Sequence, residues 1–399
     1  MDKHIAFVSM PAFGHVNPSL PLVEELVSRG YRITYATGER FLPIVEAAGA
    51  RGIPLNLSGM PARPPSGDEF TVDALVPMME KFLREVRETF PPMLAHFEQD
   101  VPSAVCYDLT TFPGRMLADK LGVLDVSLIP YLASNEKFGL QDLMKHDSFA
   151  PDNPKLMEYG KKIGMFAAEY GLDLAPQAYG GDAATLNLVL VAKELQIAAE
   201  SFDDRFVFLG PQLGRRLENE HWTPPADGKP VMLITLGTIW SENAAFFRTC
   251  VEAFGDSEWH VVMAIGERTD PDEVGPTPEN FEVFRFVPQL AVLRHARIFV
   301  SHAGMNGVME ALSFGVPIVG APQQPEQDTN GRRVEELGLG RSLGMRAPDA
   351  ETLRAAVRDV DGSAEIRANA ARMQKTFEAY EGARVGADAI EAGLARKSG

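Results

Sequence analysis

The chain of 399 residues is 45% hydrophobic and 23% charged, proportions typical of globular proteins and not of disordered or membrane-spanning ones. Its 38 basic and 55 acidic residues give a formal net charge of −17, which argues against a nucleic-acid partner because that binding depends largely on Lys and Arg. The length exceeds that of one ordinary hydrophobic core and favours two domains, or three.

Cysteine content and hydrophobic run lengths predict the compartment. Two cysteines, Cys106 and Cys250, are too few for a disulfide framework or a zinc cluster, and they fit a reducing cytoplasm. The apolar run at residues 5–8 is interrupted at once by Pro11 and Gly14, so it is too short for a signal peptide. No apolar stretch has the length that a bilayer requires. We therefore expect a cytoplasmic protein without membrane association, as a monomer or a homodimer.

The first half of the chain alternates strand-like and helix-like segments, a pattern that predicts a parallel sheet covered by helices. The predicted strands lie at residues 5–9, 31–36, 103–107, 126–129 and 186–191, and the predicted helices between the first of them lie at 18–29 and 41–48.

Two stretches of this half, 59–82 and about 131–182, lose the alternating pattern and contain many Pro, Gly, Met and aromatic residues. They are longer than ordinary connections, which usually indicates binding loops. Met and aromatic side chains adapt to ligands of varied shape, so we expect an apolar small molecule to bind here, although half of these residues could simply be core. The candidates are Phe70, Met78, Met79, Phe82, Phe112, Tyr131, Phe138, Met144 and Phe166.

A polar segment rich in Pro and Gly, 210–230, has the composition of a linker between domains. A second alternating series follows it, and the chain is predicted to be helical from residue 350. We expect a first domain at 1–209, a second at 231–380, and a C-terminal helix within 381–399 that packs back on the first domain. Strands of the second domain are predicted at 231–236, 260–265, 281–285, 297–301 and 317–320.

His15 follows the first predicted strand, where open parallel sheets present their ligand-binding residues. It lies in a predicted loop in which Gly14 permits a sharp turn, and Asn17 with Pro18 resembles the start of the next helix. A histidine in this position can act as a general base. The alternative is a loop histidine that only hydrogen-bonds the backbone.

Asp108 directly follows another predicted strand and should therefore emerge at the same edge of the sheet as His15. A carboxylate bonded to one imidazole nitrogen fixes the tautomer, and it stabilises the imidazolium that forms when the other nitrogen takes a proton. The two residues thus form a candidate dyad. Alternatively, Asp108 caps the helix that begins near Thr111.

Polar and glycine-rich clusters follow the strands of the second domain, and they predict a nucleotide-diphosphate site. His302 precedes Gly304, which opens a helix, and a helix N-terminus offers amides and a partial positive charge to phosphate. Gly237 and Thr238 follow the first strand of this domain and allow close approach of the backbone from another side. The four clusters in chain order are FVPQ at 286–289, HAGMNG at 302–307, GVP at 315–317 and PQQPEQ at 322–327, and the single residue Glu310 lies between the second and the third.

Some of these features have simpler explanations. The apolar residues of the helix after Gly304 are better explained as core, and GVP chiefly ends a helix before a strand. Glu310 could be a solvated helix residue. Asp270 and Asp272 form an Asp-x-Asp pattern that can hold a divalent metal, but they lie in an acidic loop rich in Pro, so we expect no metal and no other cofactor.

Over essentially its whole length the chain resembles the family 1 glycosyltransferases of GT-B fold, and more closely the bacterial macrolide and YjiC-like glycosyltransferases. The match rests on GHVNP at 14–18, DLTTFPGR at 108–115 and the ordered clusters of the second domain. One such motif would mean little, but four clusters in order at this spacing are highly specific. The resemblance implies an α/β protein with two facing Rossmann-like domains and a cleft between them.

The resemblance also implies roles for single residues: His15 as the base with Asp108 as its partner, and a set in the second domain that binds the nucleotide-sugar. Phe286 stands where an indole often stacks on the base, and Gly307 where a hydroxyl residue often meets the phosphate; Phe can still stack and Gly still offers its N–H. The implied contacts are Phe286 and Val287 with uracil, Gln289 and Glu310 with ribose, Gly237, Thr238, His302, Gly304, Asn306 and Gly307 with the diphosphate, and Glu326 and Gln327 with the sugar.

The implied reaction transfers a hexose, expected to be glucose from UDP-glucose, to a hydroxyl of a macrolide or flavonoid-like phenol. A single displacement would invert the anomeric centre and give a β-O-glycoside without a metal, in detoxification or antibiotic self-protection. Two other enzymes remain open: a transferase of natural-product biosynthesis with a dTDP-deoxysugar donor, and a sugar-nucleotide epimerase. A non-catalytic auxiliary protein that binds a nucleotide-sugar is also open, although such a protein need not retain His15 and Asp108.

Overall fold

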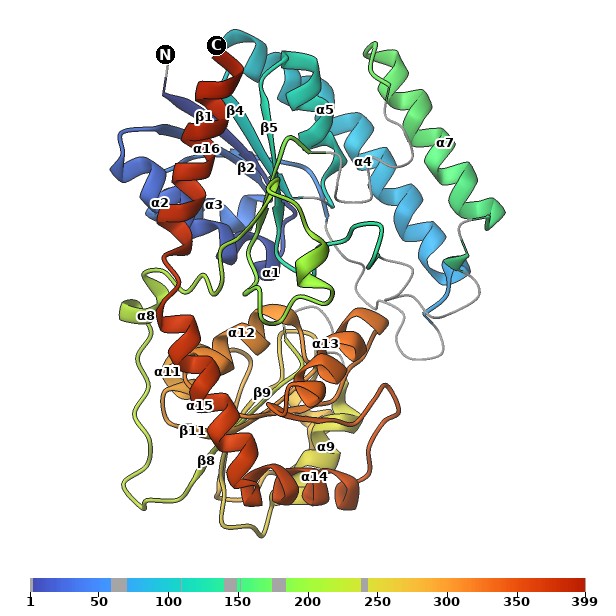
Figure 1. Cartoon of the computed structure of the whole chain (residues 1–399). Helices are drawn as coiled ribbons and strands as arrows, with labels where there is room; N and C mark the ends of the chain where they lie inside the picture. Colours follow the sequence, from blue (N-terminus) through green and yellow to red (C-terminus); the bar gives the residue numbers. More distant parts are fainter. Residues whose placement is uncertain are drawn as a thin grey trace. The chain divides into compact units, whose positions relative to one another are not determined.

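The computed structural model describes residues 3–58, 70–108, 110–139, 149–150, 152–173, 184–237 and 243–398 (Figure 1). The chain divides into two compact units. Of the described residues, those within 3–58, 71–214 and 381–398 form unit 1, and residue 70 with those within 215–380 forms unit 2.

Unit 1 is built on a parallel sheet in the order β3-β2-β1-β4-β5-β6-β7. Its strands are β1 (His4–Val8), β2 (Arg32–Thr37), β3 (Arg51–Pro54), β4 (Ala104–Asp108), β5 (Leu124–Ile129), β6 (Leu186–Val189) and β7 (Phe206–Phe208). Its helices include α1 (Phe13–Val16), α2 (Leu20–Ser28), α3 (Leu42–Ala47), α4 (Val72–Gln99), α5 (Phe112–Leu121), α7 (Pro154–Glu169) and α16 (Gly382–Ser398).

Alternate residues of β1 enter two different hydrophobic layers, one on each face of the sheet. Ile5 and Phe7 pack with α2, α3 and α16, whereas Ala6 and Val8 pack with α4, α5 and α7. Both faces are covered, which explains why the central strands read as continuous apolar runs without polar alternation.

The C-terminal helix α16 lies along α2 within unit 1 (Figure 1). Ile390 is fully buried in the same core as the sheet residues. Arg29, the residue that follows α2, donates to Asp388 at 2.7 Å and to Glu391 at 2.8 Å. The end of the chain therefore contributes to the core of unit 1 and is fastened to it by charged groups at the surface.

Substitution Ile390→Ala should destabilise unit 1 by about 2–5 kcal/mol, because it removes buried methyl and methylene groups and leaves a cavity. Urea unfolding followed by circular dichroism measures the loss. Arg396→Ala, on an exposed position of the same helix, is the control and should change the unfolding midpoint little. Equal midpoints for the two variants would contradict the packing role of α16.

Unit 2 is built on a second parallel sheet, in the order β10-β9-β8-β11-β12-β13. Its strands are β8 (Val231–Thr235), β9 (His260–Ala264), β10 (Phe281–Phe284), β11 (Ala296–Ser301), β12 (Ile318–Gly320) and β13 (Gly340–Ser342). Its helices include α8 (Arg216–Asn219), α9 (Ala244–Phe254), α10 (Pro271–Val274), α11 (Gln289–Leu293), α12 (Met305–Ser313), α13 (Pro325–Glu336), α14 (Ala350–Gly362) and α15 (Ala364–Glu378).

The structure differs from the sequence-based prediction where helices occupy predicted loops. Helix α4 begins inside 59–82, because Thr71 caps it by accepting from the Ala74 amide and because its apolar stripe packs on the sheet. Helix α7 likewise lies inside 131–182. The predicted linker is also divided, since residues 210–214 belong to unit 1 and 215–230 to unit 2.

Across the described ranges, no helix combines the length and the apolar character needed to cross a bilayer.

Candidate active site

His15 and Asp108 meet at the carboxyl edge of the unit 1 sheet. Strands β1 and β4 are neighbours, with Val8 paired to Tyr107, so the residues that follow or end them lie side by side. The Nδ1 atom of His15 forms a short hydrogen bond with Oδ2 of Asp108. The side chain of His15 stays partly exposed, whereas Asp108 is buried.

The local backbone differs from the predicted loop around His15. Residues Phe13–Val16 form the helical turn α1, in which the amides of His15 and Val16 both donate to the Ala12 carbonyl at 3.0 Å. A 3-10 turn at Asn17–Ser19 continues into α2. His15 is therefore held on a helix, and its orientation is fixed more firmly than a loop would fix it.

Thr110 is a residue of this site that the sequence analysis missed. Its amide donates to Oδ1 of Asp108 at 2.8 Å and its hydroxyl donates to the same oxygen at 2.6 Å. Asp108 thus presents Oδ1 to Thr110 and Oδ2 to His15. The signal available in the sequence was a Thr two residues after an Asp, the spacing of a local side-chain turn. The helix α5 itself has no side-chain cap, so capping of α5 is not what Asp108 does.

Asp108 is ionised in the folded protein. Its burial alone would raise the pKa of the carboxyl, but the charge and hydrogen bond of His15 together with the two bonds from Thr110 lower that pKa below its ordinary value. A buried carboxylate on Nδ1 can stabilise an imidazolium, so the pair has the electrostatics that proton abstraction requires.

A second group of residues gathers at the carboxyl edge of the unit 2 sheet, around His302. Strands β8 and β11 are paired with Ser301 opposite Thr235, which brings Gly237 and His302 together. A Cβ added to Gly237 would lie 2.7 Å from the His302 ring, and a Cβ on Gly304 would lie 2.4 Å from its Nε2 atom. Both glycines are therefore needed for the imidazole to sit against the backbone.

His302 is neutral at pH 7, because burial lowers its pKa to about 4 against the opposing effect of a hydrogen bond with the Thr235 backbone. Part of the residue is exposed, but its Nδ1 atom is buried and lacks a hydrogen-bond partner within the described residues. The partly exposed imidazole, beside the N-terminus of α12, can contact an oxygen of a bound ligand.

The lowered pKa of His302 predicts a pH-dependent stability. Because the unfolded histidine has the higher pKa of about 6.5, it binds a proton first as the pH falls, so stability is lost between about pH 6.5 and pH 4. Going from pH 7 to pH 5 should cost on the order of 2 kcal/mol more in the wild type than in His302→Asn. Urea unfolding of both proteins at each pH measures this difference, and parallel pH profiles would contradict it.

Gln289 and Glu310, both predicted to contact ribose, are brought together by α11 and α12. The Gln289 amide donates to Oε2 of Glu310 at 2.5 Å, and Arg216 donates to Oε1 at 2.6 Å. Glu310 is buried, so it is not the solvated helix residue that the sequence left open. Arg216 lies in the predicted linker, and no sequence signal connected it with Glu310.

The remaining donor-site candidates differ in exposure. Phe286 is 48% exposed beyond β10, so its ring is available to a planar ligand, and Val287 beside it is half-buried. Asn306 and Gly307 are half-buried in the first turn of α12. Thr238 lies outside the described residues.

Glu326 and Gln327 are not equivalent. Gln327 is 2% exposed and its side-chain oxygen accepts from the Gln323 amide at 2.8 Å, so it supports the loop after β12 and does not present itself at the surface. Glu326 is half-buried and accepts from Asn330 at 2.6 Å. Of the two predicted sugar-binding residues, Glu326 is the more exposed.

The aromatic candidates of unit 1 divide into core and partly exposed residues. Phe166 must be removed from the set, because it is 1% exposed and packs edge-to-face on Phe90 and Tyr170 in the core. Phe70, Phe112 and Phe138 are also buried. Met144 lies outside the described residues, and the candidates that keep partial exposure are Met78, Met79, Phe82 and Tyr131.

The Asp-x-Asp pattern has a structural explanation, because Asp270 caps the short helix α10 by accepting from the Asp272 amide at 3.0 Å. Among the residues that the structure describes, no cluster of three His, Cys, Asp or Glu side chains has the arrangement of a metal site.

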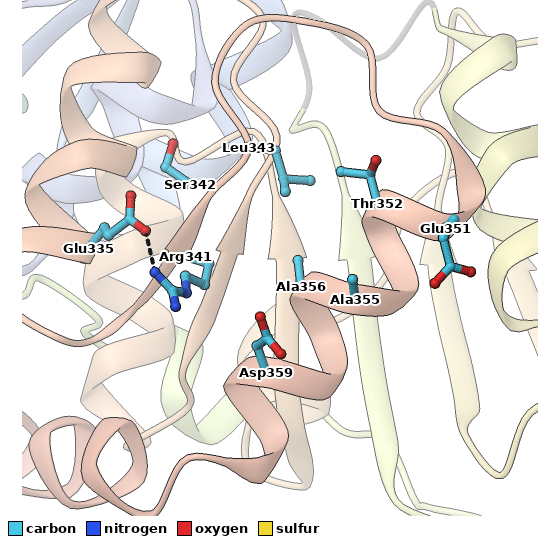
Figure 2. Close-up of a pocket in the computed structure, with 9 residues that line it drawn as sticks. All are labelled: Glu335, Arg341, Ser342, Leu343, Glu351, Thr352, Ala355, Ala356 and Asp359. Atoms are coloured by element: carbon cyan, nitrogen blue, oxygen red, sulfur yellow. Dashed lines mark hydrogen bonds and ion pairs between the residues drawn. The ribbon is translucent and has the colours of Figure 1, made fainter.

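A separate hollow of about 460 Å³ lies between β13 and α14 (Figure 2). Glu335, Glu351 and Asp359 line it together with Arg341, which donates to Glu335 at 2.9 Å. Three carboxylates against one guanidinium disfavour an anionic ligand, and none of the lining residues belongs to the predicted donor set. We therefore do not assign the hollow to nucleotide binding.

Comparison with known proteins identifies relatives along the whole chain. Residues 248–381 match the C-terminal domain of erythromycin biosynthesis protein CIII-like proteins. NDP-glycosyltransferase YjiC of Bacillus licheniformis is 38% identical, covering 98% of both chains. Oleandomycin glycosyltransferase of Streptomyces antibioticus is 35% identical, covering 98% of this chain and 91% of its own. The crystal structure of the glycotransferase of kitacinnamycin superposes with a TM-score of 0.85 at 33% identity and 98% coverage of both chains.

Proposed function

This chain belongs to the family 1 glycosyltransferases of GT-B fold, in the group of YjiC and the macrolide glycosyltransferases, and from that membership we propose that it transfers glucose from UDP-glucose to a hydroxyl of an apolar natural product with inversion. The observation that carries the catalytic part is the bond between buried, ionised Asp108 and Nδ1 of His15. In that bond Nδ1 carries the proton and donates it to Asp108, so the proton of the acceptor hydroxyl is taken by the other ring nitrogen, Nε2.

In the proposed reaction, the acceptor oxygen attacks the anomeric carbon as His15 removes its proton, and the bond from that carbon to the diphosphate breaks. One displacement inverts the centre, so an α-linked donor gives a β-O-glycoside. The diphosphate gains charge as it leaves, and the amides at the start of α12 would stabilise it. The resulting positive charge on His15 is balanced by Asp108, and neither a metal nor another cofactor takes part.

The donor assignment rests on unit 2. Phe286 offers an exposed ring to a nucleobase, and the pair of Gln289 and Glu310 offers polar groups to ribose hydroxyls. The partly exposed imidazole of His302, beside the first turn of α12, fits a phosphate oxygen. Glu326 offers a carboxylate to a hydroxyl-rich hexose, which favours glucose over a deoxysugar. The name of the Streptomyces antibioticus relative favours a macrolide acceptor, with a flavonoid-like phenol as the other class that the partly exposed Met and aromatic residues of unit 1 would fit.

The test incubates the protein with UDP-glucose, dTDP-glucose or a dTDP-deoxyhexose against a panel of macrolides and phenols. We expect mass spectrometry to show a gain of one hexose with UDP-glucose and NMR to show a β-anomer. A product formed only with the deoxysugar donor would instead indicate a dTDP-deoxysugar transferase of natural-product biosynthesis. An α-linked product would overturn inversion. Epimerised donor, or binding without turnover, would overturn the transferase reaction itself.

A further inference from the structure

The turn between β11 and α12 is strained, and it is held by specific contacts. Ala303 has a φ of +58°, in the left-handed region that residues with a Cβ rarely adopt, and it is fully buried. Its amide donates to the Ser301 hydroxyl at 3.0 Å. The conformation of Ala303 sets the direction in which His302 and the amides of α12 point, so whatever holds Ala303 also shapes the predicted diphosphate site.

Asn330 of α13 holds the other side of this turn. Its Nδ2 group donates to the Ala303 carbonyl at 3.1 Å and to Oε1 of Glu326 at 2.6 Å. Both partners are acceptors, which fixes the orientation of the amide, since a flipped side chain would set oxygen against oxygen. Asn330 is 1% exposed, and its own Oδ1 atom is buried without a partner among the described residues.

An unpaired buried oxygen is unfavourable, so the favourable contribution of this side chain comes from the two hydrogen bonds that its amide donates. It joins two elements that come from different strands: the turn that follows β11 and the helix that follows β12. The first carries His302, and the second carries Glu326.

We propose that Asn330 is a positioning residue that couples the diphosphate part of the donor site to its sugar part, through the Ala303 turn and Glu326. The inference rests on the proposed function, because it assigns the two parts to one nucleotide-sugar. Asn330 does not itself contact the donor. Its bond to the Ala303 carbonyl holds the strained turn in the conformation that binds the nucleotide diphosphate. Its bond to Oε1 of Glu326 orients that carboxylate toward a hydroxyl of the hexose.

Isothermal titration with UDP and with UDP-glucose tests the coupling, and the ratio of the two dissociation constants measures the contribution of the sugar. Asn330→Ala should weaken UDP binding about tenfold, the usual effect of one lost hydrogen bond to a buried group. It should also reduce the sugar contribution. In the wild type, Glu326→Gln should reduce the contribution of the sugar to binding. In the Asn330→Ala background, the same substitution should change that contribution less than about twofold, because the Glu326 carboxylate is no longer held in position by Asn330.

A rescue separates the two contacts of Asn330. Adding Ala303→Gly removes the cost of the left-handed conformation, so the double variant should recover UDP affinity but not the contribution of the sugar. Val334→Ala, a buried position on the same helix, is the matched control: it should lower the melting temperature and leave the ratio of dissociation constants unchanged. If Asn330→Ala does not fold, Asn330→Ser replaces it in the same cycle.

The outcomes distinguish the two proposals. A wild type that binds neither UDP nor UDP-glucose would overturn the proposed function. A wild type that binds both, with Asn330→Ala indistinguishable from it or with Glu326→Gln having the same effect in both backgrounds, would overturn the coupling alone. A ratio that changes equally in Val334→Ala would reduce Asn330 to a purely structural role and would also overturn it.

Discussion

Replacing His15 by Ala should lower turnover by roughly 10²–10⁴-fold, the range typical of a lost general base, while UDP affinity stays within about twofold. The reason is a division of roles. His15 and its partner Asp108 belong to unit 1, whereas the residues proposed to bind the nucleotide belong to unit 2. The measurement is the initial rate with UDP-glucose and the acceptor that the mass-spectrometric assay identifies, with titration calorimetry for UDP.

A matched control keeps the fold and removes another histidine. His96 lies at the last turn of α4, away from the dyad, and His96→Ala should leave turnover unchanged. Near wild-type turnover in His15→Ala would refute the general-base assignment. Loss of UDP binding together with turnover would show instead that the substitution disturbs more than the chemistry.

The sequence predicted the architecture well because hydrophobic runs and turn residues determine it locally. Both parallel sheets and the α/β class are confirmed, and relatives of GT-B fold match the whole chain. The strands that were missed, β3, β7 and β13, have three or four residues each and pair with the sheet through one neighbour only, so they carry too few apolar positions to show a period. Helix α4 was partly misjudged because its first part lies in the Pro-containing segment 59–82 that was predicted as a loop, yet packing of its apolar stripe outweighs the cost of the prolines inside it.

The site was less predictable than the fold, because its contacts join residues far apart in the chain. Strand order alone brings His15 to Asp108, and it could be inferred from the carboxyl-edge rule. The bond between Arg216 and Glu310 could not, since it depends on the path of the chain after unit 1. Burial also distinguishes Glu326 from Gln327, which lie in one motif and were both predicted to bind the sugar: Glu326 is half-buried and Gln327 is buried.

Thr110 determines how the dyad should respond to its most conservative change, Asp108→Asn. The Thr110 amide and hydroxyl both donate to Oδ1, so the oxygen of an asparagine would stay on that side and its NH₂ would face His15. Nδ1 of His15 would then have to accept, which places the ring proton on Nε2, where the acceptor proton must go. We expect turnover to fall about 10³–10⁴-fold, as tautomer loss does in other carboxylate–imidazole pairs, with UDP binding retained.

Three variants of the dyad should differ in turnover in a defined order, which is a stricter test than a single loss of activity. Asp108→Ala removes the partner without imposing the wrong tautomer, so it should retain more turnover than Asp108→Asn. Adding Thr110→Val to Asp108→Asn removes the hydroxyl donor and lets the side-chain amide of the introduced asparagine rotate more easily, so part of the lost turnover should be recovered. If Asp108→Asn is the more active of the two single variants, then Thr110 does not fix the carboxylate, and tautomer control is not the role of Asp108.

The lowered pKa of Asp108 also predicts how the stability of the folded protein depends on pH. The stabilising effect of the carboxylate is present above the pKa of the unfolded state, about 3.9, and is lost as the pH falls through the lower pKa of the folded state. The free energies of unfolding of the wild type and Asp108→Asn should therefore converge only in strong acid.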